Sequence, residues 1–261
     1  MANITVKNLN FYYGKRKILN NLNFFMGDGC ICGLLGPNGS GKTTLLDCIN
    51  GLNKPKSGEI IISEKSISNM NRKELAKKMS RVPQQTNIVF PFKVIELVVM
   101  GKAPYLENWE APGKQDYERA ATLLDNLGIR NLAGRPFNKI SGGEKQMALI
   151  ARAIFQNAEI MLLDEPTAHL DYKNQFIILD LITKVARENN LTVIITLHDP
   201  NLAMHCCDEV VMLKKGEIIS WGKTYEILKA DLLSQMYDMD ISVDFVSGGT
   251  QVIIPCHWCI K

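Results

Sequence analysis

A glycine-rich loop at residues 36–44 stands between an apolar run and an amphipathic segment, and it restricts the possible folds of this chain more than any other feature. The loop matches G-x-x-x-x-G-K-[ST] and consists of Gly36, Pro37, Asn38, Gly39, Ser40, Gly41, Lys42, Thr43 and Thr44. Cys30–Leu35 before it predicts a buried strand, and the spacing of Leu45, Leu46 and Ile49 after it predicts a helix. Strand, glycine loop and helix therefore follow one another.

This order of elements predicts a phosphate-binding site, with an ordinary glycine turn as the alternative. Glycines let successive backbone N–H groups converge on phosphate oxygens, and a helix N-terminus adds the positive end of its dipole. Lys42 is expected at the β- and γ-phosphates of a nucleotide, and Thr43 is expected to offer its hydroxyl to Mg²⁺.

A pair of adjacent carboxylates ends a second apolar strand. Ile160–Leu163 predicts this strand, and Asp164 and Glu165 follow it directly. Downstream of a phosphate loop, the first acid can hold Mg²⁺ and the second can orient the attacking water. A solvated strand terminus is the alternative for an Asp-Glu pair considered alone.

A serine and two glycines precede a third apolar helix. Ser141, Gly142, Gly143 and Glu144 stand directly before the helical pattern that begins at Met147. Serine hydroxyl and backbone N–H donors at a helix start can bind phosphate a second time. Considered alone, the same residues are a helix cap and a turn.

Strand and helix patterns alternate along the chain, which indicates an α/β fold. A composition of 46% hydrophobic and 22% charged residues supports a globular core. Residues 4–25 favour antiparallel strands around a turn at Gly14. Further strands are expected at Glu59–Ile62, Leu191–Leu197, Glu209–Leu213 and Glu217–Trp221, and helices at Tyr117–Leu127 and Tyr172–Ala186.

The distribution of these patterns predicts how the chain is divided. Residues 87–156 are dominated by helical patterns and are expected to form an insertion between two parts of a core, residues 1–86 and 157–230. Residues 231–261 form a C-terminal extension with a short helical run and a strand-like stretch over residues 243–253.

The three motifs, in this order, resemble the ATP-binding subunits of ABC transporters, whose signature reads L-S-G-G-Q. The resemblance covers nearly all of residues 1–230, with Ile140 in place of Leu and Glu144 in place of Gln. It implies a P-loop NTPase (RecA-like) α/β core with a mainly parallel sheet, an N-terminal antiparallel β subdomain and an inserted α-helical subdomain. It also implies ATP and Mg²⁺ as ligands, and hydrolysis of ATP.

The resemblance assigns further residues. Tyr13 matches the aromatic that stacks on adenine, with Tyr12 and Phe11 as competing registers. Gln84 matches the glutamine that touches Mg²⁺ and the attacking water, and Gln85 is the weaker candidate. Asp171 matches the loop that crosses between subunits, and His198 matches the histidine that senses the γ-phosphate. The other histidines are expected to be structural: His169, His205 and His257.

The partners follow from the resemblance. It implies a homodimer, or a pair with another ABC subunit, in which Ser141, Gly142 and Gly143 of one copy close the nucleotide site of the other. It also implies an integral membrane permease whose coupling helix docks near residues 90–94, a substrate-binding protein reached indirectly, and a peripheral location on the cytoplasmic face of the membrane. The start of the chain lacks a signal-peptide pattern, and no apolar run approaches the ~20 residues that span a bilayer.

One segment bears on the cargo. Residues 94–105 are similar to the V-x-E-L-V-x-x-G-R-x-P stretch of importers for iron chelates, haem and cobalamin. The alternatives are a soluble ABC-type ATPase that acts on nucleic acid, ribosomes or cluster assembly, and a P-loop kinase. A formal net charge of +3 does not by itself predict a nucleic-acid partner, and none is expected.

The seven cysteines suggest a reducing compartment. Their number is odd, and Cys30, Cys32, Cys48, Cys206 and Cys207 lie in or beside apolar stretches, where a reduced thiol behaves as a small hydrophobe. Cys256, His257 and Cys259 lie close together, but a structural zinc site needs four ligands and no second pair is evident. Metal binding there is the weaker interpretation.

Overall fold

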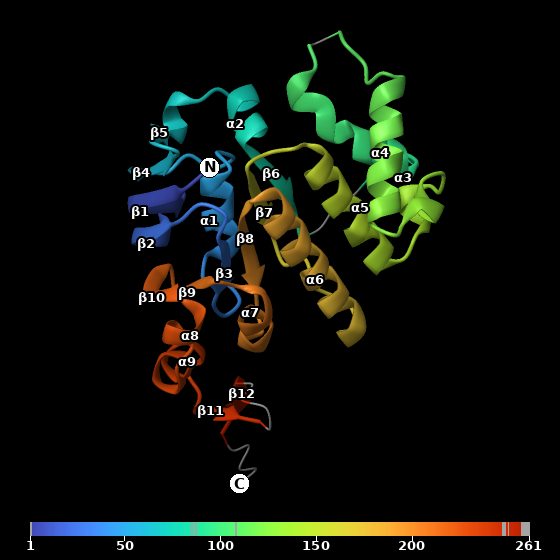
Figure 1. The fold of residues 1–261 in the computed structure, drawn as a ribbon. Coiled ribbons are helices and arrows are strands. Elements are labelled where there is room, and N and C mark those ends of the chain that lie inside the picture. The colour runs from blue at the N-terminus through green and yellow to red at the C-terminus, as the bar shows by residue number, and fades with distance from the viewer. Residues whose placement is uncertain are drawn as a thin grey trace.

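A six-stranded sheet forms the centre of the protein in a computed structural model (Figure 1) that describes residues 2–84, 86, 88–107, 109–246, 249 and 251–256. The strand order is β10-β9-β3-β8-β7-β6, and neighbouring strands are parallel except for β9 and β10. The middle strands are continuously buried, which is typical of strands covered on both faces. Their bounds are β3 Ile31–Leu35, β6 Met79–Val82, β7 Ile160–Leu163, β8 Thr192–Leu197, β9 Glu209–Lys214 and β10 Glu217–Lys223.

A second, antiparallel sheet contains the N-terminus, as the sequence predicts. Its order is β2-β1-β4-β5, with Ile4 opposite Met26 in the first pair. Apolar side chains from this sheet and from α1 form one buried cluster with one face of the central sheet. The bounds are β1 Ile4–Tyr13, β2 Arg16–Met26, β4 Ser57–Ile62, β5 Lys65–Ser66 and α1 Lys42–Ile49.

The regular elements described between β6 and β7 are helices joined by loops, and Figure 1 shows them on the side of the central sheet away from the N-terminal sheet. The helix predicted over Tyr117–Leu127 is present and begins three residues earlier. The exact ends of the insertion, at residues 87 and 156, stay predictions. Its elements are α3 Val94–Val99, the 3₁₀ helices η2 Met100–Tyr105, η3 Arg130–Leu132 and η4 Phe137–Lys139, and the helices α4 Lys114–Asn126 and α5 Gly142–Phe155.

Several elements are absent from the sequence prediction. Strand β6 was missed because its four residues include a serine and an arginine and show no apolar run. The helices missed are short: η1 Ile67–Asn69, α2 Arg72–Lys78, α7 Pro200–Cys206 and α8 Thr224–Ile227, while the predicted long helix is α6 Tyr172–Asn189. No helix in the described ranges is long and apolar enough to cross a membrane.

The C-terminal extension packs onto the core. It consists of α9 Ala230–Tyr237 and a hairpin, β11 Ile241–Phe245 and β12 Gln251–Pro255, so the strand-like stretch expected over residues 243–253 is two paired strands. Leu233 and Met236 are fully buried in the same apolar cluster as the helical segment and one face of the sheet. His257 and Cys259 lie outside the described residues, as do Gln85 and Asn87.

Candidate active site

The glycine loop connects β3 to α1, as predicted, and its backbone requires glycine at two positions. Gly36 has φ +155°, and a Cβ there would lie 2.1 Å from the carbonyl oxygen of Leu213. Gly41 has φ +108°, and a Cβ there would meet the Leu19 side chain at 2.8 Å. Since both conformations and both contacts disfavour side chains, the loop shape depends on these glycines.

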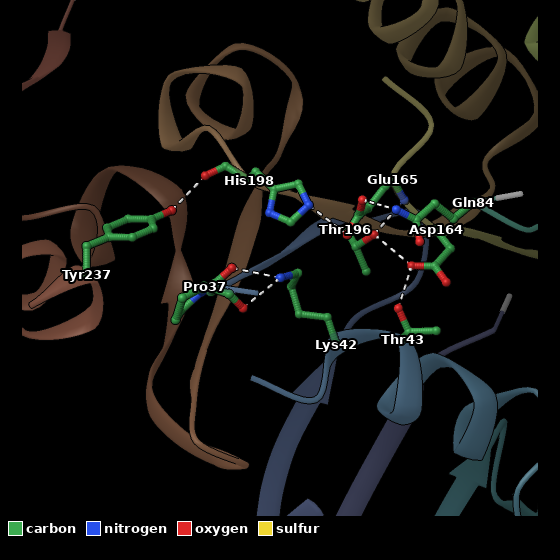
Figure 2. Close-up of polar contacts among 10 residues, drawn as sticks. Pro37, Lys42, Thr43, Gln84, Asp164, Glu165, Thr196, His198 and Tyr237 are labelled. Atoms are coloured by element: carbon green, nitrogen blue, oxygen red, sulfur yellow. Dashed lines mark hydrogen bonds and ion pairs between the residues drawn. The ribbon is translucent and has the colours of Figure 1, made fainter. Parts of the chain in front are cut away.

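Lys42 lies inside the loop that precedes it. Its ammonium donates to the carbonyl oxygens of Gly36 at 2.7 Å and Pro37 at 3.1 Å (Figure 2). Burial lowers the pKa of Lys42, and the nearby carboxylates of Glu165 and Asp164 act in the opposite direction. A buried cation that is held by two neutral carbonyls can exchange them for a stronger, charged acceptor.

Asp164 joins the acidic strand end to the loop. Its Oδ1 accepts hydrogen bonds from the Thr43 hydroxyl at 3.2 Å and the Thr196 hydroxyl at 3.1 Å, and the residue is only 2% exposed. Burial raises the pKa of Asp164 despite these bonds. Hydroxyl and carboxylate oxygens are the ligands that Mg²⁺ prefers, and one or two protein ligands suffice when phosphates supply the rest. The donor set formed by Thr43 and Asp164 therefore fits Mg²⁺.

Arg81 is a charged neighbour of this site that the sequence analysis missed. It extends from β6 between α1 and β7, with its guanidinium 2.5 Å from Asp47 Oδ1 and 3.6 Å from Asp164 Oδ2. Because β6 itself was not predicted, nothing in the sequence placed this arginine beside the carboxylates.

Glu165 is held at three points. Its φ is +49°, and its backbone N–H donates to the Thr196 hydroxyl at 2.6 Å. His198 Nε2 lies 2.6 Å from Glu165 Oε1, and the Gln84 amide donates to the other carboxylate oxygen (Figure 2). The structure thus brings together three of the predicted catalytic residues, Glu165, His198 and Gln84, at the ends of β7, β8 and β6.

A pocket of about 260 Å³ opens beside the loop, and its lining includes one of the three candidate aromatic residues. Tyr13 is about half exposed and lines this pocket together with Lys42, Thr43 and Glu165. Phe11 is buried in the core, and the Tyr12 ring lies against the Lys56 ammonium at 4.7 Å. The geometry favours Tyr13 as the residue that can meet a ring bound in the pocket. Gly39, Gly41, Asn38 and Thr44 line the pocket as well.

Ser141 caps helix α5 and forms a reciprocal pair with Glu144. The Ser141 backbone N–H and hydroxyl donate to Glu144 Oε2 at 2.8 and 2.9 Å, and the Glu144 N–H reaches Ser141 Oγ at 3.4 Å. These bonds from Ser141 lower the pKa of Glu144. The serine and Gly142 are exposed, and neither they nor Gly143 line the loop pocket.

Neither the backbone conformation nor the packing of this chain requires a glycine at position 142. Its φ is not positive, and a Cβ there would meet no atom within 4 Å. A Cβ on Gly143 would make only ordinary contacts, near 3.8 Å, with Asn174. Glycine at an exposed position without local need is typical of close approach by another molecule.

Two further predicted residues have local partners. Asp171 caps α6 by accepting from the Asn174 backbone N–H at 2.8 Å. His205 pairs with Asp180 at 2.8 Å on the surface, in accord with a structural role. His169 is exposed in the turn before α6, with φ +62°.

Two more residues at this site were missed. Thr196 is the one polar side chain near the end of the apolar strand β8, a signal that was available in the sequence. Tyr237 of α9 donates its hydroxyl to the His198 carbonyl at 2.7 Å, and nothing in the sequence of the extension signals that contact. Within the described residues, no group of three or more His, Cys, Asp or Glu side chains is arranged to hold a metal.

Comparison with known proteins identifies the family. The profile of the ABC transporter family matches residues 19–168. The chain belongs to this family. Members bind ATP and couple its hydrolysis to transport, so the chain is an ATP-binding subunit of an ABC transporter.

Relatives cover almost the whole chain. The molybdate import ATP-binding protein MolC of Haemophilus influenzae is 35% identical over 90% of this chain and 88% of its own. The iron(3+)-hydroxamate import ATP-binding protein FhuC of Bacillus subtilis is 32% identical over 93% of this chain and 90% of its own.

A solved structure extends the likeness to the C-terminal extension. It is an inward-facing metal-chelate type ABC transporter, with TM-score 0.87 and 32% identity over 99% of both chains. It confirms the predicted family and the α/β fold with a mostly parallel sheet.

Proposed function

We propose that this chain binds ATP and Mg²⁺ at the loop of residues 36–44 and hydrolyses ATP between two ABC subunits. The observation that carries the proposal is the hydrogen bond between Thr43 and Asp164, which joins the phosphate loop to the acidic strand end. Lys42 and Glu165 line the same pocket as Thr43.

Lys42 is the residue we assign to the β- and γ-phosphates. Its two present acceptors are neutral carbonyls, and phosphate oxygens form stronger, charge-assisted bonds. We also assign backbone N–H groups of the loop and of the first turn of α1 to the phosphates, because a helix N-terminus favours anions. These groups belong to Gly39, Ser40, Gly41 and Thr44. Tyr13 supplies an exposed ring for the adenine at the mouth of the pocket.

Thr43 and Asp164 are the residues we assign to Mg²⁺, with Gln84 as a third oxygen donor. When bound by these residues, Mg²⁺ would supply positive charge that offsets the charge of the β- and γ-phosphates. Asp164 is suited to a cation because burial makes its unpaired charge costly, and Arg81 at 3.6 Å compensates for it only in part.

Glu165 is the residue we assign to the attacking water, as general base. Both of its carboxylate oxygens are occupied, one by His198 and one by Gln84. His198 can exchange this contact for a γ-phosphate oxygen, which leaves one oxygen of Glu165 free to accept a proton from water. The same exchange makes the position of His198 depend on the nucleotide state.

A second subunit completes the site. Family members form dimers, and a solved dimeric structure of a bacterial ABC transporter cassette matches 85% of this chain at 31% identity with TM-score 0.75. Ser141, Gly142 and Gly143 are exposed or partly exposed and lie outside the pocket of their own chain. We assign them to the γ-phosphate of a partner copy, for which the bare Gly142 backbone allows close approach.

The helical segment is the part we assign to the permease. A groove of about 350 Å³ lies beside α2 and β6, with Leu52 and Arg72 among its lining residues, and Gln156 at the end of the helical segment lines it as well. The helical segment also carries exposed apolar side chains, among them Val89, Phe90 and Trp109. We infer that these side chains meet the permease, because exposed apolar side chains that gather in one patch are typical of an interaction site. Docking there places the chain on the cytoplasmic face of the membrane as a peripheral subunit.

The cargo we favour is an iron chelate, haem or a cobalamin-type compound, delivered by a substrate-binding protein. The support is residues 94–105 together with relatives such as FhuC. The side chains of residues 94–105 form contacts within the helical segment. Glu96 accepts from the Lys93 backbone N–H at 2.8 Å, and Lys102 donates to Asp116 at 2.7 Å. We therefore take residues 94–105 as a mark of the class of permease that this subunit serves, and not as residues that contact the cargo.

Three experiments test these assignments. The purified full chain should hydrolyse ATP only with Mg²⁺, and an integral membrane protein should co-purify with it from native membranes. Loss of the gene should abolish uptake of labelled ferric hydroxamate, haem or cobalamin, while uptake of molybdate continues. Loss of molybdate uptake alone would contradict the cargo assignment and leave the ATPase assignment intact.

A further inference from the structure

The C-terminal extension reaches the catalytic end of the sheet through one side chain. The Tyr237 hydroxyl of α9 donates to the backbone carbonyl of His198 at 2.7 Å, and the imidazole of the same histidine lies 2.6 Å from Glu165 (Figure 2). We propose that Tyr237 is a positioning residue, which fixes the His198 peptide and thereby aims the imidazole at Glu165. This inference rests on the function proposed above.

The His198 carbonyl needs a partner outside the sheet. The parallel ladder between β3 and β8 ends at Leu197, one residue earlier, and the next residue, Asp199, caps α7. Pro200 follows and has no N–H to offer. A peptide group at this point is held by neither the ladder nor the helix, so the Tyr237 hydroxyl decides its orientation.

Tyr237 is itself fixed by contacts that do not involve the active site. Leu233 and Met236 of the same helix are fully buried. The Lys214 ammonium at the end of β9 donates to the Gln235 carbonyl and the Asp238 carboxylate just before and after Tyr237. The position of the hydroxyl is therefore set by the packing of α9.

The hairpin that follows adds a second attachment close to His198. Asn201 of α7 donates its side-chain amide to the Ile253 carbonyl at 3.1 Å, and its side-chain oxygen accepts from the Ile253 N–H at 2.9 Å. The extension thus holds the chain on both sides of the β8–α7 junction. A tyrosine phenol is protonated at neutral pH and can donate, and burial raises the pKa of Tyr237 further.

The first test is the Tyr237→Phe variant of the full chain, with Tyr225→Phe as the matched control because Tyr225 is 61% exposed on α8. We expect Tyr237→Phe to lower kcat for ATP hydrolysis by about three- to tenfold, the change that corresponds to one neutral hydrogen bond. KM for ATP should stay within about twofold, since no phosphate-binding residue changes. The control should match the wild type.

The second test is a spectroscopic signature at the histidine. The chain has four histidines, and the imidazole signal that disappears in His198→Ala identifies His198 in a nitrogen-correlated NMR spectrum. This signal should move in Tyr237→Phe and stay in place in Tyr225→Phe. Unchanged kcat, or a lower kcat with an unmoved His198 signal, would overturn the inference. A wild-type chain without ATPase activity would instead refute the proposed function.

Discussion

Replacing Glu165 by glutamine separates the chemical step from nucleotide binding. A glutamine at this position can keep both contacts of the carboxylate: its oxygen can accept from Gln84, and its amide can donate to Nε2 of a neutral His198. The backbone bond from residue 165 to Thr196 is untouched. The variant therefore loses charge and basicity with little change in structure.

The expected loss in kcat is about 10²–10⁴-fold, the range for a missing general base. This loss corresponds to about 3–5 kcal/mol in the activation free energy at 1.36 kcal/mol per factor of ten. Affinity for ATP should change by less than about threefold, because Lys42 and the glycine loop are unchanged. Steady-state phosphate release and calorimetric titration with ATP measure the two quantities.

Glu188→Gln is a suitable control, since Glu188 is exposed and pairs with Lys184 on the surface at 3.9 Å. It should keep wild-type turnover and affinity. A Glu165→Gln chain that hydrolyses ATP at the wild-type rate would refute the assignment of the general base. A variant that loses ATP binding as well would show that Glu165 contributes to the ground state.

Three other substitutions test the remaining parts of the site. Lys42→Ala should weaken ATP binding by about 10–150-fold in calorimetry, the loss expected for a hydrogen bond to a charged group, and unchanged affinity would contradict its placement at the phosphates. Gly142→Ala should leave the unfolding free energy of the chain within about 0.5 kcal/mol of the wild type, because the new Cβ meets nothing in its own chain. It should abolish ATP-dependent dimerisation in sedimentation, because the new Cβ stands where the nucleotide of the partner copy must approach. Asp164→Asn should remove Mg²⁺-dependent turnover and raise the melting temperature of the nucleotide-free chain near neutral pH. Burial raises the pKa of Asp164 in the folded chain above its ordinary value of 3.8. The stability of the wild-type chain therefore falls as pH rises from 3.8 through the raised pKa. Below pH 3.8 Asp164 is protonated in both states, and the stability advantage of the variant should vanish.

The sequence was sufficient where a motif depends on consecutive residues. The glycine loop, the acidic strand end and the capping serine lie on the predicted elements because each motif contains its own strand or helix boundary. Likewise, the alternation of buried strands and amphipathic helices was enough to predict the α/β fold. The family resemblance added Gln84, for Mg²⁺ and the attacking water, and His198, for the γ-phosphate, and the structure shows that both contact Glu165.

Contacts between distant segments could not be predicted from local patterns. Arg81 lies on a strand of four residues that has no apolar run, so its position between Asp47 and Asp164 had no local signal. Tyr237 reaches His198 across 39 residues of sequence through the packing of α9. Such contacts depend on tertiary packing, which overrides the weak preferences of short segments.

Mixing two inactive variants tests the shared active site most directly. A Lys42→Ala chain keeps an intact Ser141–Gly143 segment, and a Gly142→Asp chain keeps an intact phosphate loop, so each variant alone lacks one half of every site. If each site is built from two chains, the mixed dimer contains one complete site, and ATP hydrolysis should reappear on mixing. Hydrolysis that stays at the level of the separate variants, in mixtures shown by sedimentation to contain mixed dimers, would contradict the account.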